Sequence, residues 1–587
     1  MSSLCKEIVT LQLGHYSNFV GTHWWNLQDA SLSEELGEIN SDVAFREGRT
    51  IDGQVTYTPR LIAMDLKGSL QTLRQEGCLY STNKESSTIS WEGAITMHQE
   101  SPVSKNPFLL DLDKLETGVL LAQDDFNNTD KAHGSGAFGA DSVNRQLERV
   151  AKSYALEGSV RVWSDFLRIH LHPRTISVIH QYNHDGETHR LEAFGQGEPL
   201  LQGSLLEDLE DRLHFFIEEC DNLQGFQVLC DLTNGFSGLG SKVTELLQDS
   251  YGGKGILTWG MVPVTHPNST PMKDLYHVIN TALGMVHMAN HSSFFCPLTL
   301  RGGLGRRPGP PVAFPHLTYD PSLWYHSSSV LALTLDALTA PCRLRQNGVP
   351  VGQMADLLTG SGRKVVAAYG TVPLPMMQGT TLPDSLSSCA DALPWKPLSS
   401  CPDGGGGQCY AQLLTLRGLD EQRLVSHAVP GPHAPSALHG LHSGEDVLAS
   451  YISSFYPTGT LDMHLLSSPS KLTPPFPQIF SADLDEQGWL QSRYLPPGSV
   501  PPTVSSAPVL TCLQSSPALG PWLAELQRTV GALNIRRLAP SFLSQGPEMS
   551  EYQEALEQLR LLARCYRDDS KGAANFSSED DDEDSDD

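Results

Sequence analysis

Residues 220–249 read CDNLQGFQVLCDLTNGFSGLGSKVTELLQD, and they carry the clearest fold signal in the chain. Gly225–Leu232 is a short apolar run of the kind that forms a buried strand. A glycine-rich turn interrupts the run, with Asn234, Gly235, Gly238 and Gly240. Beyond the turn, apolar residues recur at helical spacing, at Leu239, Val243, Leu246 and Leu247. The stretch therefore predicts a strand, a tight turn and a helix.

The predicted turn has a geometry that suits an anion. The first N–H groups of a helix lack intrahelical partners and carry partial positive charge, which favours a phosphate. Glycines let the backbone approach such an anion without a side chain in the way. Many strand-to-helix turns bind nothing, so a purely structural turn is the alternative.

The same alternation of strand and helix occurs nearer the start of the chain. Ile8–Leu13 reads as an apolar strand, and a glycine turn and a helix through Trp24 and Trp25 follow it. Leu61–Asp65 reads as a further strand. Strands that alternate with helices predict parallel βα units and a doubly wound α/β sheet.

Three segments in the same order resemble the tubulin family. They are KEIVTLQLGHYSNFVGTHWW (6–25), YTPRLIAMDLKGSL (57–70) and ECDNLQGFQ (219–227). The match is closer to a divergent branch, the Misato family, through Trp24-Trp25, VWSDFLRIHLHPRTI (162–176) and NGFSGLG (234–240). The chain is identified as a member of that branch. The resemblance is close over about residues 4–390 and looser in the rest of the chain.

The resemblance implies a tubulin-like α/β fold with the following organisation. A nucleotide-binding domain covers residues 1–322 with a large insertion at about 80–160, and a central helix covers 323–345. A smaller α/β domain with Pro/Ser-rich loops covers 346–510, C-terminal helices cover 511–567, and an acidic disordered tail covers 568–587. The insertion is either a partner surface or a tolerated excursion. Most of residues 457–510 read as connections, and Ser550 with Gln553 predicts a capping box for the last helix. In that helix Tyr552, Leu556, Leu559 and Ala563 form a predicted apolar stripe.

In tubulins the corresponding loops hold GTP or GDP, so the resemblance implies a nucleotide site. The positions carried over are Gly14, His15, Asp65, Gly195, Gly197, Gly235, Ser237, Gly238, Gly240 and the base-stacking Trp324. Three of the tubulin positions have changed. His15 stands where tubulins have glutamine, Lys67 replaces the glutamate near magnesium, and Ser328 replaces the asparagine that reads guanine. One alignment also places the bulky Phe236 against the phosphates.

Hydrolysis in tubulins uses a Gly-x-x-Asn-x-Asp loop from the next subunit in the filament. The counterpart here is Gly352-Gln353-Met354-Ala355-Asp356, which lacks the asparagine and is one residue short. Water must be placed accurately for phosphoryl transfer. We therefore predict no efficient GTPase, no catalytic residue and no microtubule-like polymer. A histidine-rich stretch with His427, His433, His439 and His442 is read as a solvated loop rather than a metal site.

Composition limits the partners. The net charge is −27, and eight acidic residues fall within positions 579–587, so nucleic acids are poor electrostatic partners. Charged residues make up 18% of the chain and apolar ones 39%, which fits a folded protein. The apolar run from Val330 is short and contains Asp336, so we expect a buried core helix rather than a membrane span. Any membrane association is expected to be peripheral.

The resemblance also implies a function. It points to a regulator of mitochondrial distribution and morphology, including network formation and fusion, in the cytoplasm and on the cytosolic face of the mitochondrial outer membrane. Protein partners on that membrane are expected, with tubulin or a cytosolic chaperonin as further candidates. The alternatives are an active GTP-binding switch and an assembly factor that acts on tubulin and microtubules.

Overall fold

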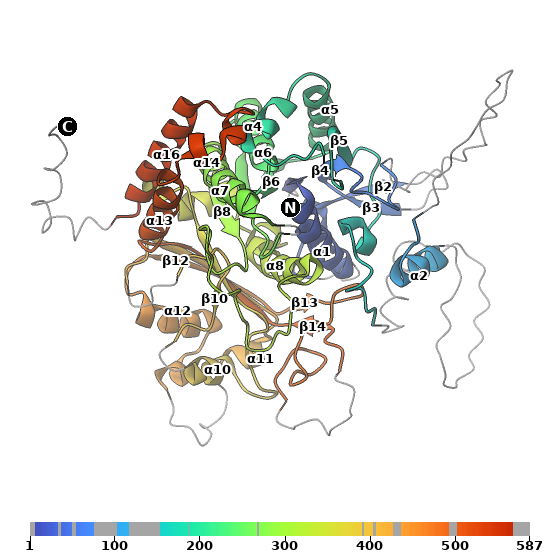
Figure 1. Ribbon diagram of the computed structural model, residues 1–587. Coiled ribbons are helices and arrows are strands. Elements are labelled where there is room, and N and C mark those ends of the chain that lie inside the picture. The colour runs from blue at the N-terminus through green and yellow to red at the C-terminus, as the bar shows by residue number, and fades with distance from the viewer. Residues whose placement is uncertain are drawn as a thin grey trace, which may run out of the picture.

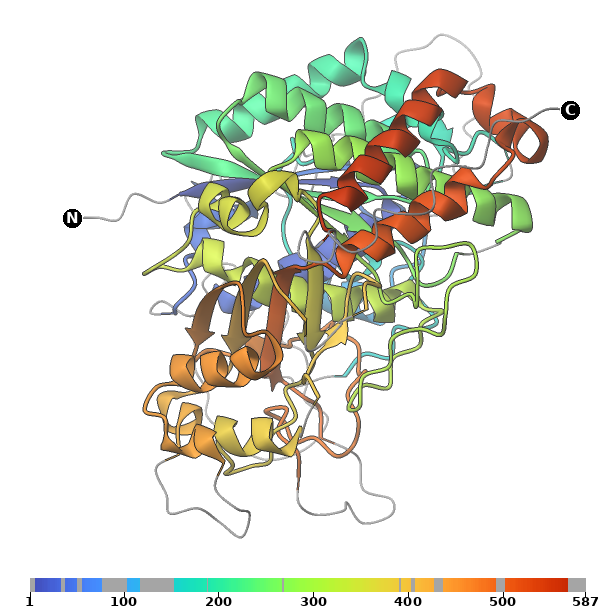
Figure 2. The ribbon, with the colours of Figure 1, turned by 90° about the vertical axis from the view of Figure 1, so that its left-hand side faces the viewer.

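The computed structural model describes residues 6–32, 37–49, 55–75, 103–116, 153–186, 188–266, 269–389, 392–402, 407–426, 436–491 and 502–567. Two sheets form the frame of the molecule, and a helical layer lies between them (Figures 1 and 2). The acidic tail at 568–587, His427, His433 and most of the insertion lie outside the described residues.

The first sheet has six parallel strands in the order β5-β4-β1-β6-β7-β8. They are β1 (Glu7–Leu13), β4 (Leu61–Lys67), β5 (Ile176–Asn183), β6 (Leu223–Asp231), β7 (Gly255–Met261) and β8 (Phe294–Leu298). Every residue of β1, β7 and β8 is buried, as expected for parallel strands covered on both faces. The predicted doubly wound sheet is confirmed, and β6 follows the predicted strand at Gly225–Leu232.

Helices cover both faces of this sheet. On one face lie α5 (Ser204–Glu218), α6 (Phe236–Ser250) and α7 (Pro271–His291). On the other face α1 (His15–Ser31) packs along α8 (Trp324–Thr339). Side chains alternate between the two faces, so Val9 packs with the first group of helices and Ile8 with the second.

The second sheet is mixed, in the order β10-β9-β15-β11-β12. Its strands are β9 (Ala367–Thr371), β10 (Lys396–Pro397), β11 (Ala411–Arg417), β12 (Thr460–Leu466) and β15 (Val509–Ser515). Strand β15 pairs antiparallel with both β9 and β11, and α12 (Gly444–Phe455) packs on β12. The far side also carries α10 (Leu382–Ser388), below the sheet in Figure 2.

One expectation for this region was wrong. The boundary at 510 falls inside β15, a central strand of the second sheet. The described part of residues 457–510 consists mostly of connections, as expected, but it also contains the seven-residue strand β12. Its sequence TLDMHLL alternates polar and apolar residues, which is the pattern of a half-buried strand, and β12 pairs in parallel with β11.

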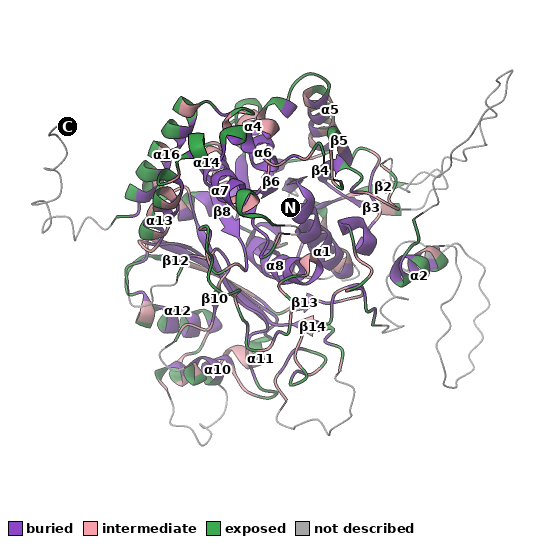
Figure 3. Cartoon of the chain, viewed as in Figure 1, coloured by how far each residue is buried: buried purple, intermediate pink, exposed green. Residues whose placement is uncertain are grey.

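The central helix α8 is buried along its length (Figure 3). Asp336 lies in the middle of it and forms ion pairs with Arg343 and Arg417. The expectation of a buried core helix is therefore confirmed. In the described parts of the chain, no helix is both long and apolar enough to cross a membrane.

The C-terminal helices α13 (Leu519–Gly531) and α16 (Met549–Arg564) pack against each other and against α7. Helix α16 buries Tyr552, Leu559 and Ala563, as its apolar stripe predicted. The predicted Ser550–Gln553 capping box was wrong, because the helix begins earlier and its box is Glu548 with Glu551. Glutamate is not a preferred capping residue, so the sequence favoured the serine.

The remaining elements are short or peripheral. They are β2 (Phe45–Arg49), β3 (Val55–Pro59), β13 (Ser470–Lys471), β14 (Ser506–Ala507), α2 (Pro107–Glu116), α4 (Phe194–Gly197), α9 (Val351–Leu358), α11 (Glu421–Leu424), α14 (Ile535–Leu538), α15 (Pro540–Leu543) and 3-10 turns at Ser41–Val43, Trp163–Phe166, Glu198–Leu200, Ala340–Arg343, Gly360–Gly362 and Ala437–Gly440. Of these, α4 is the one that shapes the candidate site, because it packs on α6.

Candidate functional site

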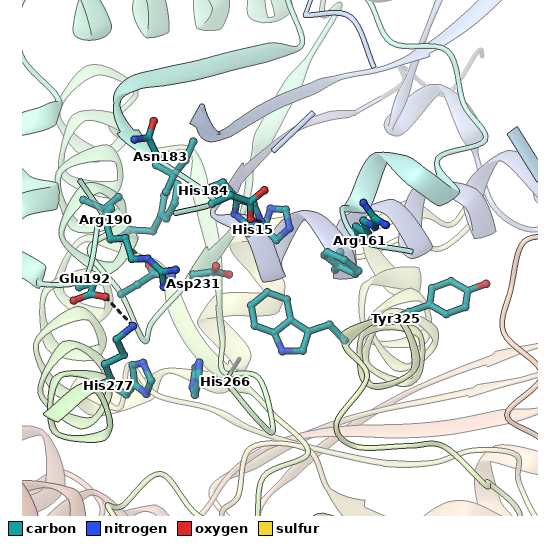
Figure 4. Close-up of a pocket in the computed structure, with 18 of the residues that line it drawn as sticks. His15, Arg161, Asn183, His184, Arg190, Glu192, Asp231, His266, His277 and Tyr325 are labelled. Atoms are coloured by element: carbon teal, nitrogen blue, oxygen red, sulfur yellow. Dashed lines mark hydrogen bonds and ion pairs between the residues drawn. The ribbon is translucent and has the colours of Figure 1, made fainter. Parts of the chain in front are cut away.

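A cavity of about 450 Å³ opens at the carboxyl edge of the first sheet (Figure 4). It lies where the strand order reverses, between β1 and β6, which is where open α/β sheets bind ligands. His15, Asp231 and Trp324 line it, together with the loop after β5 and the start of α7. Of the ten predicted site residues, His15 and Trp324 line this cavity.

The N-terminus of α1 is occupied by the carboxylate of Asp231, the last residue of β6. Its Oδ1 accepts hydrogen bonds from the N–H and the hydroxyl of Ser17, both at 2.7 Å, and its Oδ2 accepts from the Tyr16 N–H at 3.1 Å. Gly14 has a φ of 111°, and a Cβ there would lie 2.5 Å from this carboxylate. The anion position of the first loop is therefore filled by the protein itself.

Burial raises the pKa of Asp231 to about 6. The hydrogen bonds from Ser17 and Tyr16 act in the opposite direction, and the nearby charge of Asp65 adds to the rise. The carboxylate is thus held at the helix terminus although its ionised form is poorly solvated. Its main-chain contacts at α1 are those that a bound phosphate would otherwise make.

The N-terminus of α6 is also satisfied internally. The Gly235 N–H donates to the Leu191 carbonyl at 3.3 Å, and the Phe236 N–H donates to Asn234 Oδ1 at 2.9 Å. The Ser237 N–H donates to the Asn234 carbonyl at 3.1 Å, and the Ser237 hydroxyl donates to the same oxygen at 2.7 Å. The turn predicted to hold a phosphate therefore directs its donors to protein acceptors.

The glycines of the predicted phosphate loops permit close backbone packing of α4 on α6. A Cβ on Gly197 would lie 1.7 Å from the Gly235 carbonyl oxygen, and one on Gly238 would lie 2.1 Å from the Phe194 oxygen. Gly240 similarly lies against the Cys230 sulfur, and Gly195 lies against the backbone of Gly546. Packing between neighbouring segments accounts for these glycines without a ligand.

Asn280 of α7 fixes this packing from the other side. Its Oδ1 accepts from the Phe194 N–H at 2.8 Å, and its Nδ2 donates to the carbonyls of Glu192 at 2.7 Å and Thr233 at 3.0 Å. Asn280 is not among the predicted site residues. An amide inside an apolar helix pattern was the one available signal, since buried polar groups are as a rule hydrogen-bonded.

Asp65, at the carboxyl end of β4, is enclosed by protein donors. Its Oδ2 accepts from His15 Nδ1 at 2.8 Å, Trp163 Nε1 at 2.8 Å and Asn18 Nδ2 at 3.2 Å. Burial alone would raise the pKa of Asp65, but His15, His184 and the Leu66 N–H more than offset this and hold it below its usual range. Because the carboxylate accepts at Nδ1, the Nε2 of His15 carries the free lone pair.

The base end of the predicted nucleotide site has an aromatic wall. Trp324 donates from Nε1 to the Thr265 carbonyl at 2.9 Å, and its ring lies 5.1 Å from that of Tyr16. Phe236 also lines the cavity and is 1% exposed. Ser328, at the position of the guanine-reading asparagine, is fully buried, and its hydroxyl is directed to the Tyr325 carbonyl.

Sequence reasoning missed the charged and histidine side chains of the cavity. Arg161, Arg190 and Lys273 lie among the acidic groups Glu157, Asp185, Glu192 and Asp231, so cations do not exceed anions. His184, His266 and His277 also line the cavity, and burial is the main cause that lowers the pKa values of His184 and His277 to about 4. These residues come from separate segments with no motif to connect them.

The residues present do not fit the triphosphate of a nucleotide. Both helix N-termini that would bind phosphates have acceptors of their own, and the lining has no cationic excess. The predicted counterpart of the hydrolytic loop, with exposed Asp356, lies on α9. Its Val351 contacts Gly225 and Gly255 at the amino ends of β6 and β7, on the opposite edge of the sheet from the cavity.

Comparisons with known proteins agree with this architecture. Residues 6–114 match the Misato Segment II tubulin-like domain, and residues 154–344 match the tubulin domain. The chain is 64% identical to protein misato homolog 1 of Danio rerio, with full coverage of both chains. It is 46% identical to protein misato homolog 1 of Homo sapiens, over 97% of this chain and 99% of that protein. Protein misato of Drosophila melanogaster is 30% identical, over 96% and 99%. The chain therefore belongs to the Misato family, with a tubulin-like fold.

Proposed function

We propose that this protein is a non-catalytic member of the tubulin superfamily that supports mitochondrial distribution and morphology from the cytosolic face of the outer membrane. It acts through protein contacts and does not turn over GTP. The observation that carries the non-catalytic part is the Asp231 carboxylate at the N-terminus of α1, bonded to Tyr16 and Ser17.

Electrostatics supports this proposal. Two like charges 4 Å apart repel by about 4 kcal/mol at an effective dielectric constant near 20. A phosphate at the α1 terminus would meet the charge of Asp231 at about such a distance, unless the carboxyl group were protonated. The three cations of the lining are offset by four acidic groups, and Lys273 already pairs with Glu192 at 3.2 Å. The cavity therefore lacks the charge that polyphosphate binding requires.

The mitochondrial part of the proposal has a different support. It rests on the family resemblance. Peripheral contact with the membrane, through a protein partner, is the form we propose. An active GTP-binding switch is the runner-up, and the Trp324 wall of the cavity is the observation that favours it, because an aromatic ring can stack on a base.

The nucleotide content of the purified full-length protein tests the non-catalytic part. The protein is denatured, released nucleotides are separated by chromatography, and fresh protein is heated with GTP, GDP or ATP, each with Mg²⁺. We expect less than one tenth of an equivalent of nucleotide and no rise in melting temperature, whereas tubulin prepared in parallel releases guanine nucleotide. Stoichiometric guanine nucleotide, or GTP turnover that Asp356→Ala abolishes, would refute this part.

Depletion and rescue in cells tests the mitochondrial part. We expect loss of the protein to alter the shape of the mitochondrial network, and re-expression of the wild type or of Asp356→Ala to restore it equally. An unchanged network after depletion would reject the mitochondrial role. A stable Asp356→Ala protein that fails to rescue would favour the GTPase alternative. Co-purification of tubulin with an unchanged network would favour the assembly-factor alternative.

A further inference from the structure

Three metal-ligating side chains meet beside the cavity, from the carboxyl ends of three neighbouring strands. His15 follows β1, Asp65 lies in β4, and His184 follows β5, and these strands are adjacent in the order β5-β4-β1. One potential ligand atom from each residue lies within 4.8 Å of the other two. Sheet topology therefore brings together residues that are far apart in the sequence.

His15 has an unexplained lone pair. The side chain is 91% buried, and its Nδ1 is 2.8 Å from Asp65 Oδ2. Its Nε2 is buried and has no hydrogen-bond partner. Metal-binding histidines commonly donate their other ring N–H to a carboxylate, which fixes the tautomer and aims the free nitrogen. The Asp65–His15 pair has this arrangement before any ion is bound.

His184 supplies the second imidazole. Its ring centroid lies 3.7 Å from that of His15 at an interplanar angle of 35°, and the two rings lie side by side in Figure 4. Imidazole lone pairs lie in the ring plane, so two imidazoles that bind one tetrahedral zinc ion at about 2.0–2.1 Å cannot stay stacked. Binding therefore requires the His184 ring to turn away from His15. The His184 side chain is 22% exposed and lines the cavity, so it has room for this rotation.

We propose that His15 Nε2 and His184 bind a divalent ion of the zinc class, and that Asp65 orients His15. Imidazole ligands select zinc and similar transition metals over magnesium and calcium, which prefer oxygen ligands. The remaining coordination positions face the cavity and are filled by water. The site does not depend on the proposed scaffold function, and it uses no nucleotide.

The cavity contains a second histidine pair that serves as a matched control. His266 and His277 have ring centroids 3.8 Å apart at 31°, close to the geometry of the first pair. In the part of the chain that the structure describes, no third ligand completes a metal-binding group with them. His277 also lines the cavity, so His277→Gln changes the same surface without touching the proposed ligands.

The test uses the full chain after chelator treatment, titrated with Zn²⁺ alone by calorimetry and with Co²⁺ alone by visible absorption. We expect one equivalent of tight zinc and a cobalt spectrum that reports nitrogen coordination. His184→Gln should abolish the tight equivalent, and Asp65→Asn should weaken binding about 10–100-fold, as loss of an orienting partner does. His277→Gln should bind zinc as the wild type does.

Three outcomes would overturn the metal site. The first is no tight zinc binding by the folded wild type, and the second is an unchanged zinc affinity in His184→Gln. The third is an equal loss of zinc affinity in His184→Gln and His277→Gln, which would mean non-specific binding by exposed histidines. Far-UV circular dichroism of each variant confirms that the fold is kept. His184→Gln is the decisive variant, because its partly exposed side chain can be changed without opening the core.

Discussion

Asparagine in place of Asp336 tests how the two halves of the molecule are joined. Asp336 Oδ1 accepts from Arg343 Nη2 and from Gln28 Nε2, both at 2.8 Å. Its Oδ2 accepts from Ser470 at 2.9 Å and from Arg417 Nη1. These partners come from α1, the turn after α8, strand β11 of the second sheet and the short strand β13. A single carboxylate thus ties the central helix to the second sheet.

The contribution of Asp336 to the stability of the fold can be worked out from the structure in two ways. Burial would raise the pKa of Asp336, but Arg417 and Arg343 offset this and lower it to about 2 from 3.8. That difference corresponds to about 2 kcal/mol of stability. Because the folded pKa is depressed, this stability is present above pH 3.8 and is lost as the pH falls toward 2. Removal of the charge also leaves two buried arginines unpaired, which costs about 3–5 kcal/mol.

We expect Asp336→Asn to lower the free energy of unfolding at pH 7 by about 3–5 kcal/mol, measured by urea denaturation with tryptophan fluorescence. The variant should also lack the part of the acid destabilisation that falls between pH 4 and 2. The control is Glu245→Gln on α6, whose side chain is 39% exposed and pairs with Lys242 at 2.8 Å. An exposed pair of this kind contributes at most about 1 kcal/mol.

A loss in Asp336→Asn no larger than that of the control would refute the reasoning. It would mean that the arginines find other partners or water, and that the buried pairs do not hold the central helix against the second sheet. If the acid destabilisation between pH 4 and 2 were unchanged in the variant, its assignment to Asp336 would be refuted separately.

Two further predictions concern the core around the cavity. Gly197→Ala should destabilise the fold by several kcal/mol or prevent folding, because its Cβ would meet the Gly235 carbonyl. The control is Gly352→Ala, which has open space around it and should leave the thermal melt unchanged. His23 is buried with its Nε2 3.0 Å from the Tyr325 carbonyl, and burial lowers its pKa to about 3. Since the folded state favours neutral His23, the contribution of this residue to stability should fall by roughly 1 kcal/mol per pH unit below 6.5. His23→Gln should therefore reduce the slope of the urea midpoint against pH between pH 6.5 and 5, and equal slopes in both proteins would contradict this.

The amino-acid sequence is enough to predict those elements that are marked by patterns of neighbouring residues. The apolar run before the glycine turn became β6, and the apolar stripe after it became α6, because hydrophobic period and turn residues act within a few positions. The same holds for the buried helix around Asp336 and for the apolar stripe of α16. In these elements the spacing of the apolar residues already shows which face packs.

The arrangement of the second sheet and the character of the site follow from tertiary contacts. Strands β12 and β15 have strand-like sequences, but their positions on either side of β11, one parallel and one antiparallel, depend on pairing between distant segments. Asp231 and Ser17 are 214 positions apart, and no spacing rule connects a strand end to the helix terminus that it caps. Likewise His15 and Asp65 meet because their strands are neighbours. The glycine loops were visible in the sequence. Only the folded chain shows that the Asp231 carboxylate and the backbone occupy the positions of the phosphates, because contacts between distant segments form on folding.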